Sequence, residues 1–347
     1  MSVDWLKISN KGAGLTNQLF TFITGLILAK YKGCEKIVID SFFIDAFRNE
    51  NKPISQVFDL IECNNFFRSY NLEIVDIDAL TVNVFYGIND RFIDITSVWP
   101  KILPAEYNIN NLAGDPAPNV EKILYIQYKN DRGDVVISYV CPEQRQTDLH
   151  TPPIFTSLFA WIDTFDRKMF DNILRNITFN YSYRHLAELY IDEMNSTGAT
   201  EVNIIHVRLE NDIKHWSDIN KMTEMEYRRS LENKYILSIV ENFDKRSRIL
   251  VLSYDYNNRV IEYLKNNGYN YHCPPKYSHL GREENAIVDF LIASKSCTNA
   301  FIGNFNISKL KGSTFSYLIY LYLKPGMKYI YIDIDKINDP AITEELR

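Results

Sequence analysis

Short apolar runs alternate with longer helical stretches along much of the chain, and this alternation predicts an α/β fold. Residues 5–9 and 35–40 predict two strands, and residues 17–31 between them predict a helix. The helix is apolar almost all round, so we expect it to be buried between layers. A strand, a glycine-containing loop, a helix and a second strand form the typical opening of a doubly wound domain.

The second half of the chain repeats the alternation more regularly. Thr223 and Glu226 form the pattern of a capping box at the start of a helix at 222–243, and Gly268 is placed to end the helix that follows. A polar loop is expected between this helix and the strand at 202–207. Further strands are predicted at 248–253, 299–303 and 329–334, and further helices at 183–195, 258–267, 283–294 and 317–323.

The middle of the chain is less regular. A helical region is predicted at 57–67, and strands are predicted at 72–77 and 124–128. Residues 102–120 are rich in Asn, Pro and Ala and predict a long loop. Residues 155–165 carry apolar side chains at helical spacing, which predicts a helix there.

Length and composition indicate a globular protein with more than one domain. A chain of 347 residues exceeds the size at which a single core keeps growing, so we expect two α/β domains, at 1–180 and 181–347. The apolar fraction of 46% and the charged fraction of 24% are ordinary for such proteins. A net charge of −6 without any Lys- or Arg-rich run argues against nucleic-acid binding.

The cysteines and the apolar runs bear on the compartment. The five cysteines are widely spaced and form no CxxC pair, so neither a zinc site nor a disulfide framework is predicted, and a reducing compartment fits best. The first residues do not form a signal peptide. The most apolar run, residues 19–29, is too short to span a membrane. We therefore expect a cytoplasmic protein with no transmembrane segment.

A group of charged side chains follows the strand at 202–207. His206, Arg208 and Asp212 lie within seven residues, together with Glu210. Ligands bind just beyond the carboxyl ends of strands in open α/β sheets, so Arg208 is placed to meet an anionic ligand. Its guanidinium is always charged and can hold two phosphate oxygens at once. The alternative is a surface ion pair between Arg208 and one of the two carboxylates.

Three other stretches are suited to anions. Gly12 and Gly14 let backbone N–H groups approach a ligand where a helix begins, although their loop lacks the GxGxxG spacing and the lysine of a P-loop. Asp255 ends the strand at 248–253. The hydroxyl-rich turn at 313–316 opens a helix and suits phosphate oxygens, although a plain N-cap would have the same composition. Together these features favour a nucleotide-sugar transferase.

Three sequence blocks carry a resemblance to a known family. GAGLTNQLF at 12–20 resembles the glycine loop of α-1,2-fucosyltransferases and, more loosely, of α-1,6- and protein O-fucosyltransferases. HVR at 206–208 resembles their HxR signature. AIVDFLIAS at 286–294, FIGN at 301–304 and STFS at 313–316 are similar to their C-terminal block. The blocks come in the order of the family and span most of the chain.

The resemblance implies a GT-B-like fold, in which two Rossmann-type doubly wound domains face each other across a cleft. The domain at 1–180 would carry the glycine loop and meet the acceptor, and the domain at 181–347 would bind the nucleotide sugar. The implied reaction is an inverting, metal-independent transfer of fucose from the donor GDP-fucose to a glycan hydroxyl, with no cofactor. The same resemblance implies a role for each matching residue.

Arg208 would bind the diphosphate, and Asn17 would lie near the sugar and the acceptor hydroxyl. His206 and Asp289 would contact the guanine base or shape its pocket. Phosphate oxygens would be held by the hydroxyls of Ser313, Thr314 and Ser316. The candidates for the general base are Asp212, Glu210 and Asp40, and Asp212 is our first choice. The other expected donor-binding residues are Gly12, Gly14 and Asp255.

The chain departs from the family pattern at several positions. Thr16 and Ala13 replace glycines of the loop, and Leu209 stands where α-1,2 enzymes carry a second arginine. Residues 305–312 are extra and contain two lysines. Two alternatives therefore stay open: a GT-B transferase that uses another nucleotide sugar, and a non-catalytic nucleotide- or glycan-binding module.

Aromatic and histidine side chains complete the list of candidates. His215, Trp216 and Trp99 would suit a sugar site, although core packing is the more common use of tryptophan. His272 and His279 have no metal-ligand spacing with any cysteine except the adjacent Cys273, so no metal is expected.

Overall fold

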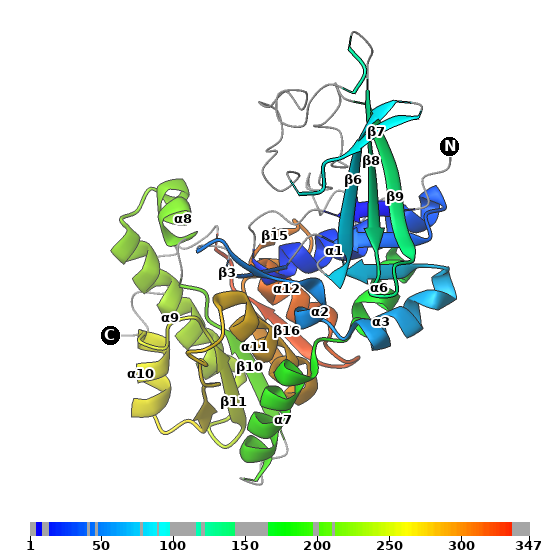
Figure 1. Cartoon of the computed structure of the whole chain (residues 1–347). Coiled ribbons are helices and arrows are strands. Elements are labelled where there is room, and N and C mark those ends of the chain that lie inside the picture. The colour runs from blue at the N-terminus through cyan, green and yellow to red at the C-terminus, as the bar shows by residue number, and fades with distance from the viewer. Residues whose placement is uncertain are drawn as a thin grey trace. The chain divides into compact units, whose positions relative to one another are not determined.

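The structure is a computed structural model (Figure 1), and the residues it describes are 5–8, 14–39, 42–45, 48–76, 79–88, 90–97, 116–118, 122–142, 166–196, 201–209 and 212–334. The chain divides into two compact units. The first consists of Met1–Ala13, Gln18–Phe43 and Asn51–Thr178, and the second of Gly14–Asn17, Ile44–Glu50 and Phe179–Arg347.

The second unit is built on a five-stranded parallel sheet. Its strand order is β12-β11-β10-β13-β16. The strands are β10 (Val202–His206), β11 (Arg248–Leu252), β12 (Tyr271–His272), β13 (Ala300–Gly303) and β16 (Lys328–Tyr331). The four strands predicted in this half are therefore confirmed, and β12 is an addition at the edge.

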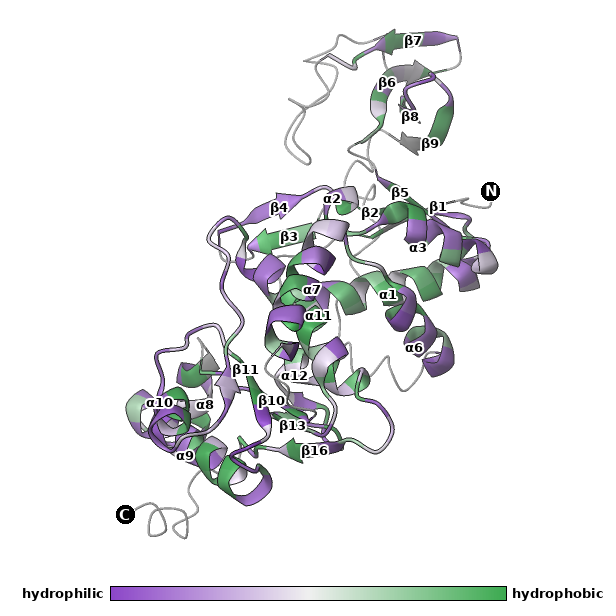
Figure 2. Cartoon of the chain, turned by 90° about the horizontal axis from the view of Figure 1, so that it is seen from below, coloured by the Kyte–Doolittle hydropathy of each residue, from purple (hydrophilic) through white to green (hydrophobic). Residues whose placement is uncertain are grey.

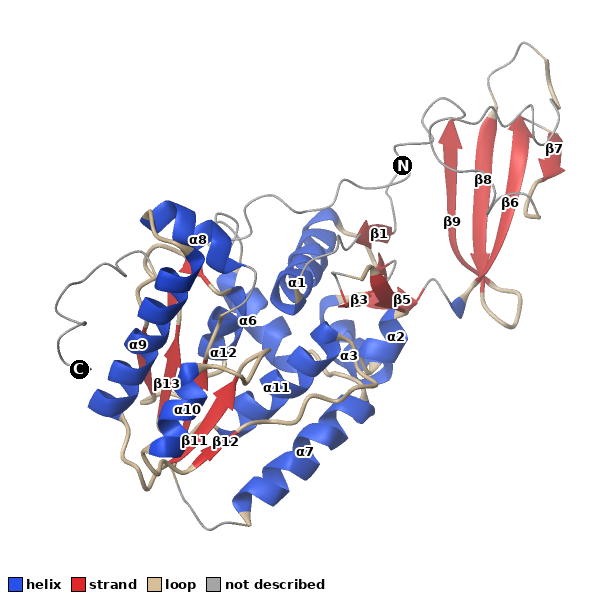
Figure 3. Ribbon diagram, turned by 90° about the vertical axis from the view of Figure 1, so that its left-hand side faces the viewer, coloured by secondary structure: helices blue, strands red, loops and turns tan. Residues whose placement is uncertain are grey.

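Helices cover both faces of this sheet (Figure 3). One face packs against α8 (Asp212–Asn220), α9 (Glu224–Asn242) and α10 (Arg259–Asn266), and the other carries α7 (Tyr181–Asn195), α11 (Arg282–Ser296) and α12 (Thr314–Leu321). Every residue of β10 and β11 is buried as a result. This burial explains why both strands are mostly apolar in the sequence.

Local signals set most of the helix ends in this unit. The Thr223 hydroxyl accepts from the backbone N–H of Glu226, and the Glu226 carboxylate accepts from the backbone N–H of Thr223, so the predicted capping box is confirmed. The Asn258 side chain caps α10, and Gly268, with φ of 70°, follows its end as predicted. The helix predicted at 317–323 begins earlier, at Thr314, because Ser313 caps it.

The polar loop expected before α9 is wrong, because residues 212–220 form the helix α8. Ile213 and Trp216 lie three positions apart and pack against the core formed by β10, β11 and α9, and Ser217 is buried beside them. The polar side chains on the remaining surface of α8 conceal this short apolar face in the sequence.

The first unit contains a small parallel sheet of β1 (Trp5–Ile8), β2 (Lys36–Ile39) and β5 (Glu73–Asp76), in the order β1-β2-β5. The helix α1 (Leu15–Lys32) joins the first two strands. Phe20, Ile23 and Leu26 are fully buried, and the helix is hydrophobic over most of its length in Figure 2, so its predicted burial is confirmed.

Short elements and one more helix complete this part of the chain. The predicted helical region at 57–67 consists of α2 (Ile54–Val57) and α3 (Leu60–Phe67), followed by the 3₁₀ turn η1 (Arg68–Tyr70). The strands β3 (Phe42–Asp45) and β4 (Glu50–Lys52) pair with each other, and α6 (Arg167–Asn176) packs Phe170 edge-on against Phe20.

A four-stranded antiparallel sheet is the main departure from the expected doubly wound pattern. It runs in the order β7-β6-β8-β9 and consists of β6 (Thr81–Ile88), β7 (Arg91–Asp94), β8 (Ile123–Lys129) and β9 (Val135–Pro142). Only β8 was predicted. The fold is thus mixed α/β, with parallel sheets and this four-stranded antiparallel sheet as an addition. The helix predicted at 155–165 and most of the loop at 102–120 lie outside the described residues.

Candidate functional site

The strand end that carries Arg208 is held by a buried tyrosine. The Tyr235 hydroxyl, on α9, donates to the carbonyl of His206 at 2.9 Å and accepts from the backbone N–H of Arg208 at 3.4 Å. The backbone N–H of Val207 donates to the carbonyl of Leu252 on β11 at 2.9 Å. The backbone from which the half-buried Arg208 side chain extends is therefore fixed on two sides.

The side chain of Arg208 contacts the start of α12, and the sequence marked each of these two features separately as suited to anions. The Nη1 of Arg208 donates to the Oγ of Ser313 at 2.9 Å. Ser313 is the N-cap of α12, and its hydroxyl also accepts from the backbone N–H of Ser316 at 3.4 Å. A permanent cation and the positive end of a helix therefore meet at one hydroxyl, an arrangement suited to phosphate oxygens.

His206 belongs to a buried, uncharged network beside this pair. Its Nδ1 lies 2.7 Å from the Oγ of Ser316, which also donates to the Oδ1 of Asn304 at 3.3 Å. The ring of Phe315 contacts the imidazole edge-on, at 5.0 Å between centroids. Burial lowers the pKa of His206 to about 3, with further lowering from the charges of Arg208 and Lys276. The imidazole is therefore neutral at ordinary pH and adds no positive charge.

A small pocket that is partly open to solvent lies next to Arg208. Arg208, Asn304 and Ser313 contribute polar groups to its wall, and most of its other lining residues are apolar. Its lining residues are Arg208, Ile213, Trp216, Tyr227, Leu231, Asn304, Gly312, Ser313 and Ile334. The ring of Trp216 therefore lines a pocket beside the guanidinium, while the same residue also packs against the core.

The extra residues at 305–312 form a hairpin that leads into Ser313. The strands β14 (Phe305–Asn306) and β15 (Lys311–Gly312) pair antiparallel. Gly312 has φ of 122°, and a Cβ on it would lie 1.9 Å from the carbonyl oxygen of Asn304. Only glycine fits this close approach, so the hairpin sets the position of the N-cap.

Asp289 is a buried carboxylate with a partner that the sequence did not predict. Its side chain, on α11, is 9% exposed and lies 2.5 Å from the ammonium of Lys276. Burial raises the pKa of Asp289, and the charge of Lys276 and its hydrogen bond oppose that rise. The same ammonium lies 5.2 Å from the centroid of the Tyr256 ring. The residue expected near a guanine base is therefore part of an ion pair beside an aromatic ring.

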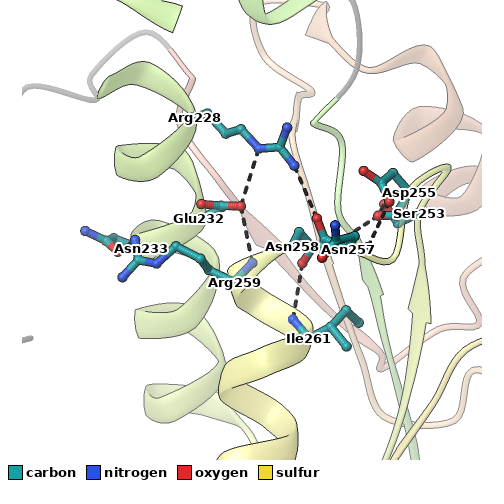
Figure 4. A network of polar contacts seen from close by, with 9 residues as sticks. All are labelled: Arg228, Glu232, Asn233, Ser253, Asp255, Asn257, Asn258, Arg259 and Ile261. Carbon is teal, nitrogen blue, oxygen red and sulfur yellow. Dashed lines mark hydrogen bonds and ion pairs between the residues drawn. The ribbon is translucent and has the colours of Figure 1, made fainter. Parts of the chain in front are cut away.

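Asp255 stabilises the turn that follows β11. Its carboxylate accepts from the backbone N–H of Asn257 at 2.8 Å, and its carbonyl accepts from the side chains of Ser253 and Asn258. Figure 4 shows this turn next to the buried Glu232, which accepts from the backbone N–H of Arg259 at the start of α10. The network ties α9, α10 and the turn together, and Asp255 has a local structural role within it.

The remaining candidates fall into two groups. Gly14 precedes α1, and the half-buried Asn17 lies in its first turn, where its backbone N–H donates to the carbonyl of Gly14 at 3.0 Å. The hydroxyl of Thr16 is buried there and has no hydrogen-bond partner among the residues that the structure describes. Asp212 begins α8, and Thr314 begins α12. The other candidates, which are Gly12, Asp40, Trp99, Glu210 and the side chain of Asp212, lie outside what the structure describes.

Sequence reasoning missed three residues that shape this site. Tyr235 lies in a helix far along the chain from His206, and no local pattern marks it. The lysine that pairs with Asp289 comes from an irregular stretch after β12. Asn304 stood in a matching block without a role, and its place directly after a buried strand was the signal that could have identified it.

Among the residues that the structure describes, no three His, Cys, Asp or Glu side chains are grouped as metal ligands would be. None of the helices that the structure describes combines the length and the apolar character that a membrane span requires.

No family model and no curated protein matches the chain. Among solved structures, it is similar to POFUT1 in complex with GDP-fucose, with 11% identity over 96% of this chain and 99% of that one, at a TM-score of 0.49. It is also similar to the fucosyltransferase NodZ from Bradyrhizobium, with 11% identity over 93% and 94% of the two chains, at a TM-score of 0.47. NodZ alpha-1,6-fucosyltransferase soaked with GDP-fucose shares 12% identity over 92% and 93%, at 0.48.

Proposed function

We propose that the chain is an inverting, metal-independent glycosyltransferase that moves fucose from GDP-fucose to a hydroxyl group of a glycan. The observation that carries this proposal is the hydrogen bond from Arg208 to Ser313, which joins a permanent cation to the N-cap of α12. The choice of fucose and guanine is supported by the resemblance of the three sequence blocks to GDP-fucose-dependent enzymes. The proposal includes the GT-B arrangement that this resemblance implies, with donor and acceptor meeting in a cleft between two α/β domains.

A diphosphate leaving group explains why Arg208 and the start of α12 would be placed together. Negative charge builds up on its oxygens as the bond to the sugar breaks, and preorganised donors lower the energy of that state. The guanidinium of Arg208 stays protonated throughout, and the first turn of α12 offers backbone N–H groups and a partial positive charge. The neutral His206 positions Ser316 without repelling the guanidinium. This site therefore meets the charge of the leaving group with protein groups alone.

The reaction forms one bond as it breaks another. The acceptor hydroxyl attacks the anomeric carbon from the face opposite the diphosphate, the bond from that carbon to the phosphate oxygen breaks, and the configuration inverts. The hydroxyl proton passes to a base, for which Asp212 remains our candidate. Asn17 would orient the sugar or the acceptor.

The decisive experiment is a donor screen that measures released nucleoside diphosphate in the presence of EDTA. We expect GDP release from GDP-fucose that increases when glycan acceptors are added and that does not change with EDTA. Release from a UDP- or ADP-sugar instead would identify a transferase for another nucleotide sugar. Thermal stabilisation by GDP without turnover over a broad acceptor set would identify a non-catalytic binding module.

A further inference from the structure

The strands β10 and β13 part at the edge of the sheet from which Arg208 extends. Their paired residues end at Ile205 and Ile302, whereas β10 stays bonded to β11 as far as Val207. The strand order reverses at this point, because β11 and β12 lie on one side of β10, and β13 and β16 lie on the other. In doubly wound sheets, ligands bind at the strand ends next to such a reversal.

The parting leaves two backbone groups of the β10 segment beyond the paired residues. In a parallel strand, alternate residues direct their N–H and C=O groups to the same neighbour. Val202 accepts from the N–H of Thr298 just before β13, and the residues of β10 alternate from there, so that the N–H of Val207 donates to β11. The carbonyl of His206 and the N–H of Arg208 therefore face the β13 side, beyond the end of the pairing.

The hydroxyl of Tyr235 bonds to both of these groups. It donates to the carbonyl of His206 at 2.9 Å and accepts from the N–H of Arg208 at 3.4 Å. The tyrosine is fully buried in the core that α9 forms with β10, β11 and β13, so close packing fixes where the hydroxyl lies. One oxygen atom of a core residue thus takes the place of a strand on this side of Arg208.

We propose that Tyr235 is a positioning residue for Arg208: its hydroxyl fixes the backbone at the parted strand end and so sets where the guanidinium meets the donor diphosphate. Without the hydroxyl, this backbone keeps its bond to β11 and loses both bonds on the β13 side. A displacement of roughly 1 Å at a reacting group can lower a rate about 100-fold. This inference rests on the proposed function.

The test is Tyr235→Phe, which removes the hydroxyl and keeps the packed ring. We expect kcat for nucleoside diphosphate release from GDP-fucose to fall roughly 10- to 100-fold, with a smaller change in the KM for the donor. The reason is that a displaced guanidinium keeps its charge but loses its alignment with the leaving group. The matched control is Tyr269→Phe, which changes a buried tyrosine of the same core that precedes β12, at the opposite end of the strands, and should keep the wild-type rate.

A double-mutant cycle separates positioning from a purely structural role. If Tyr235 acts through Arg208, adding Tyr235→Phe to Arg208→Ala should not lower the rate further. The same fold loss in both backgrounds would mean that the hydroxyl supports the fold in general, and it would overturn the assignment. A Tyr235→Phe variant as active as Tyr269→Phe would overturn it too.

A measurement on the wild type covers the case in which Tyr235→Phe does not fold. The backbone N–H of Arg208 should exchange with deuterium, followed by NMR, as slowly as the buried amides of β10, because Tyr235 holds it. Fast exchange at Arg208 would overturn the role of Tyr235 and leave the proposed function intact. A wild-type chain that releases no nucleoside diphosphate from GDP-fucose or from another sugar donor would overturn both.

Discussion

The Nδ1 atom of His206 lies 2.7 Å from the hydroxyl of Ser316, although 110 positions separate the two residues in the chain. The contact joins the carboxyl end of β10 to the first turn of α12. Because the imidazole is buried and uncharged, it orients the serine instead of repelling the nearby guanidinium of Arg208.

The burial of His206 predicts a specific dependence of stability on pH. The pKa of His206 is about 3 in the folded chain and about 6.5 in an unfolded one, so the unfolded state binds the extra proton between these values. The contribution of the neutral His206 imidazole to the free energy of unfolding is complete above pH 6.5, and it decreases as the pH falls toward 3. We expect urea unfolding to show that the wild type loses about 2 kcal/mol more than His206→Gln between pH 7 and pH 5. Parallel pH profiles for the two proteins would contradict a buried neutral imidazole.

Gly312 sets the geometry of the phosphate-binding turn. A methyl group there would meet the carbonyl oxygen of Asn304 at 1.9 Å, at a backbone φ of 122°. We expect Gly312→Ala to destabilise the chain by on the order of 3 kcal/mol and to weaken GDP binding, because the N-cap residue Ser313 must move.

Gly326 provides the matched control for that substitution. It also has a positive φ, of 92°, but a Cβ on it would meet no atom of the described residues within 4 Å beyond its chain neighbours. Gly326→Ala should therefore cost only the backbone strain, about 1 kcal/mol, and leave GDP binding unchanged. If Gly312→Ala and Gly326→Ala lowered the unfolding temperature and the GDP affinity by similar amounts, the close approach of Gly312 to Asn304 would have no part in the site.

The sequence predicted the parallel sheet of the second unit well because its strands are buried on both faces. Burial on both faces favours mostly apolar runs, and β10 and β11 have them, apart from Asn203 and His206 in β10 and Arg248 in β11. Caps are equally local, so Thr223 and Glu226 were recognised directly. The antiparallel strand β6 was missed because exposed and half-buried residues interrupt its buried positions, which include Val84 and Tyr86.

Individual residues of the candidate site could be predicted from the sequence, but the contacts between them could not. Arg208 and Ser313 were each singled out for a local reason, a strand end and a helix start. The bond between them spans 105 positions and depends on the pairing of β10 with β13, which no local pattern specifies. The ion pair of Asp289 and the contact of Lys311 with Trp216 likewise join segments distant in the sequence.

The ion pair between Lys276 and Asp289 predicts that replacing Lys276 lowers the stability by an amount that depends on pH. Lys276→Met leaves a buried carboxylate without its cation, so we expect a loss on the order of 3 kcal/mol at pH 7. Burial already raises the pKa of Asp289, and the loss of Lys276 raises it further. A carboxyl whose folded pKa is raised binds more protons in the folded state, so the deficit should shrink as the pH falls from 7 to 5.

The double variant Lys276→Met with Asp289→Asn separates charge from packing. An amide needs no counter-ion, so most of the stability at pH 7 should return, and the extra dependence on pH should disappear. Urea unfolding at both pH values measures this. A deficit that persists in the double variant would mean that Lys276 acts through a contact other than its ion pair, such as that of its ammonium with the Tyr256 ring.

Arg208 provides the most direct test of the site. One substitution can remove its positive charge, and another can keep the charge but remove the planar pair of N–H donors. Arg208→Ala should lower the rate of transfer by roughly 10²–10³-fold, the usual effect of losing one preorganised donor to a developing oxyanion. Arg208→Lys keeps the charge but cannot hold two oxygens at once, so it should recover only part of the rate. Arg229→Ala, at an exposed position on α9, controls for the loss of one positive charge from the surface. All three rates are measured as released nucleoside diphosphate at saturating donor. Turnover of Arg208→Ala close to that of Arg229→Ala would rule out the guanidinium as the group that stabilises the leaving diphosphate.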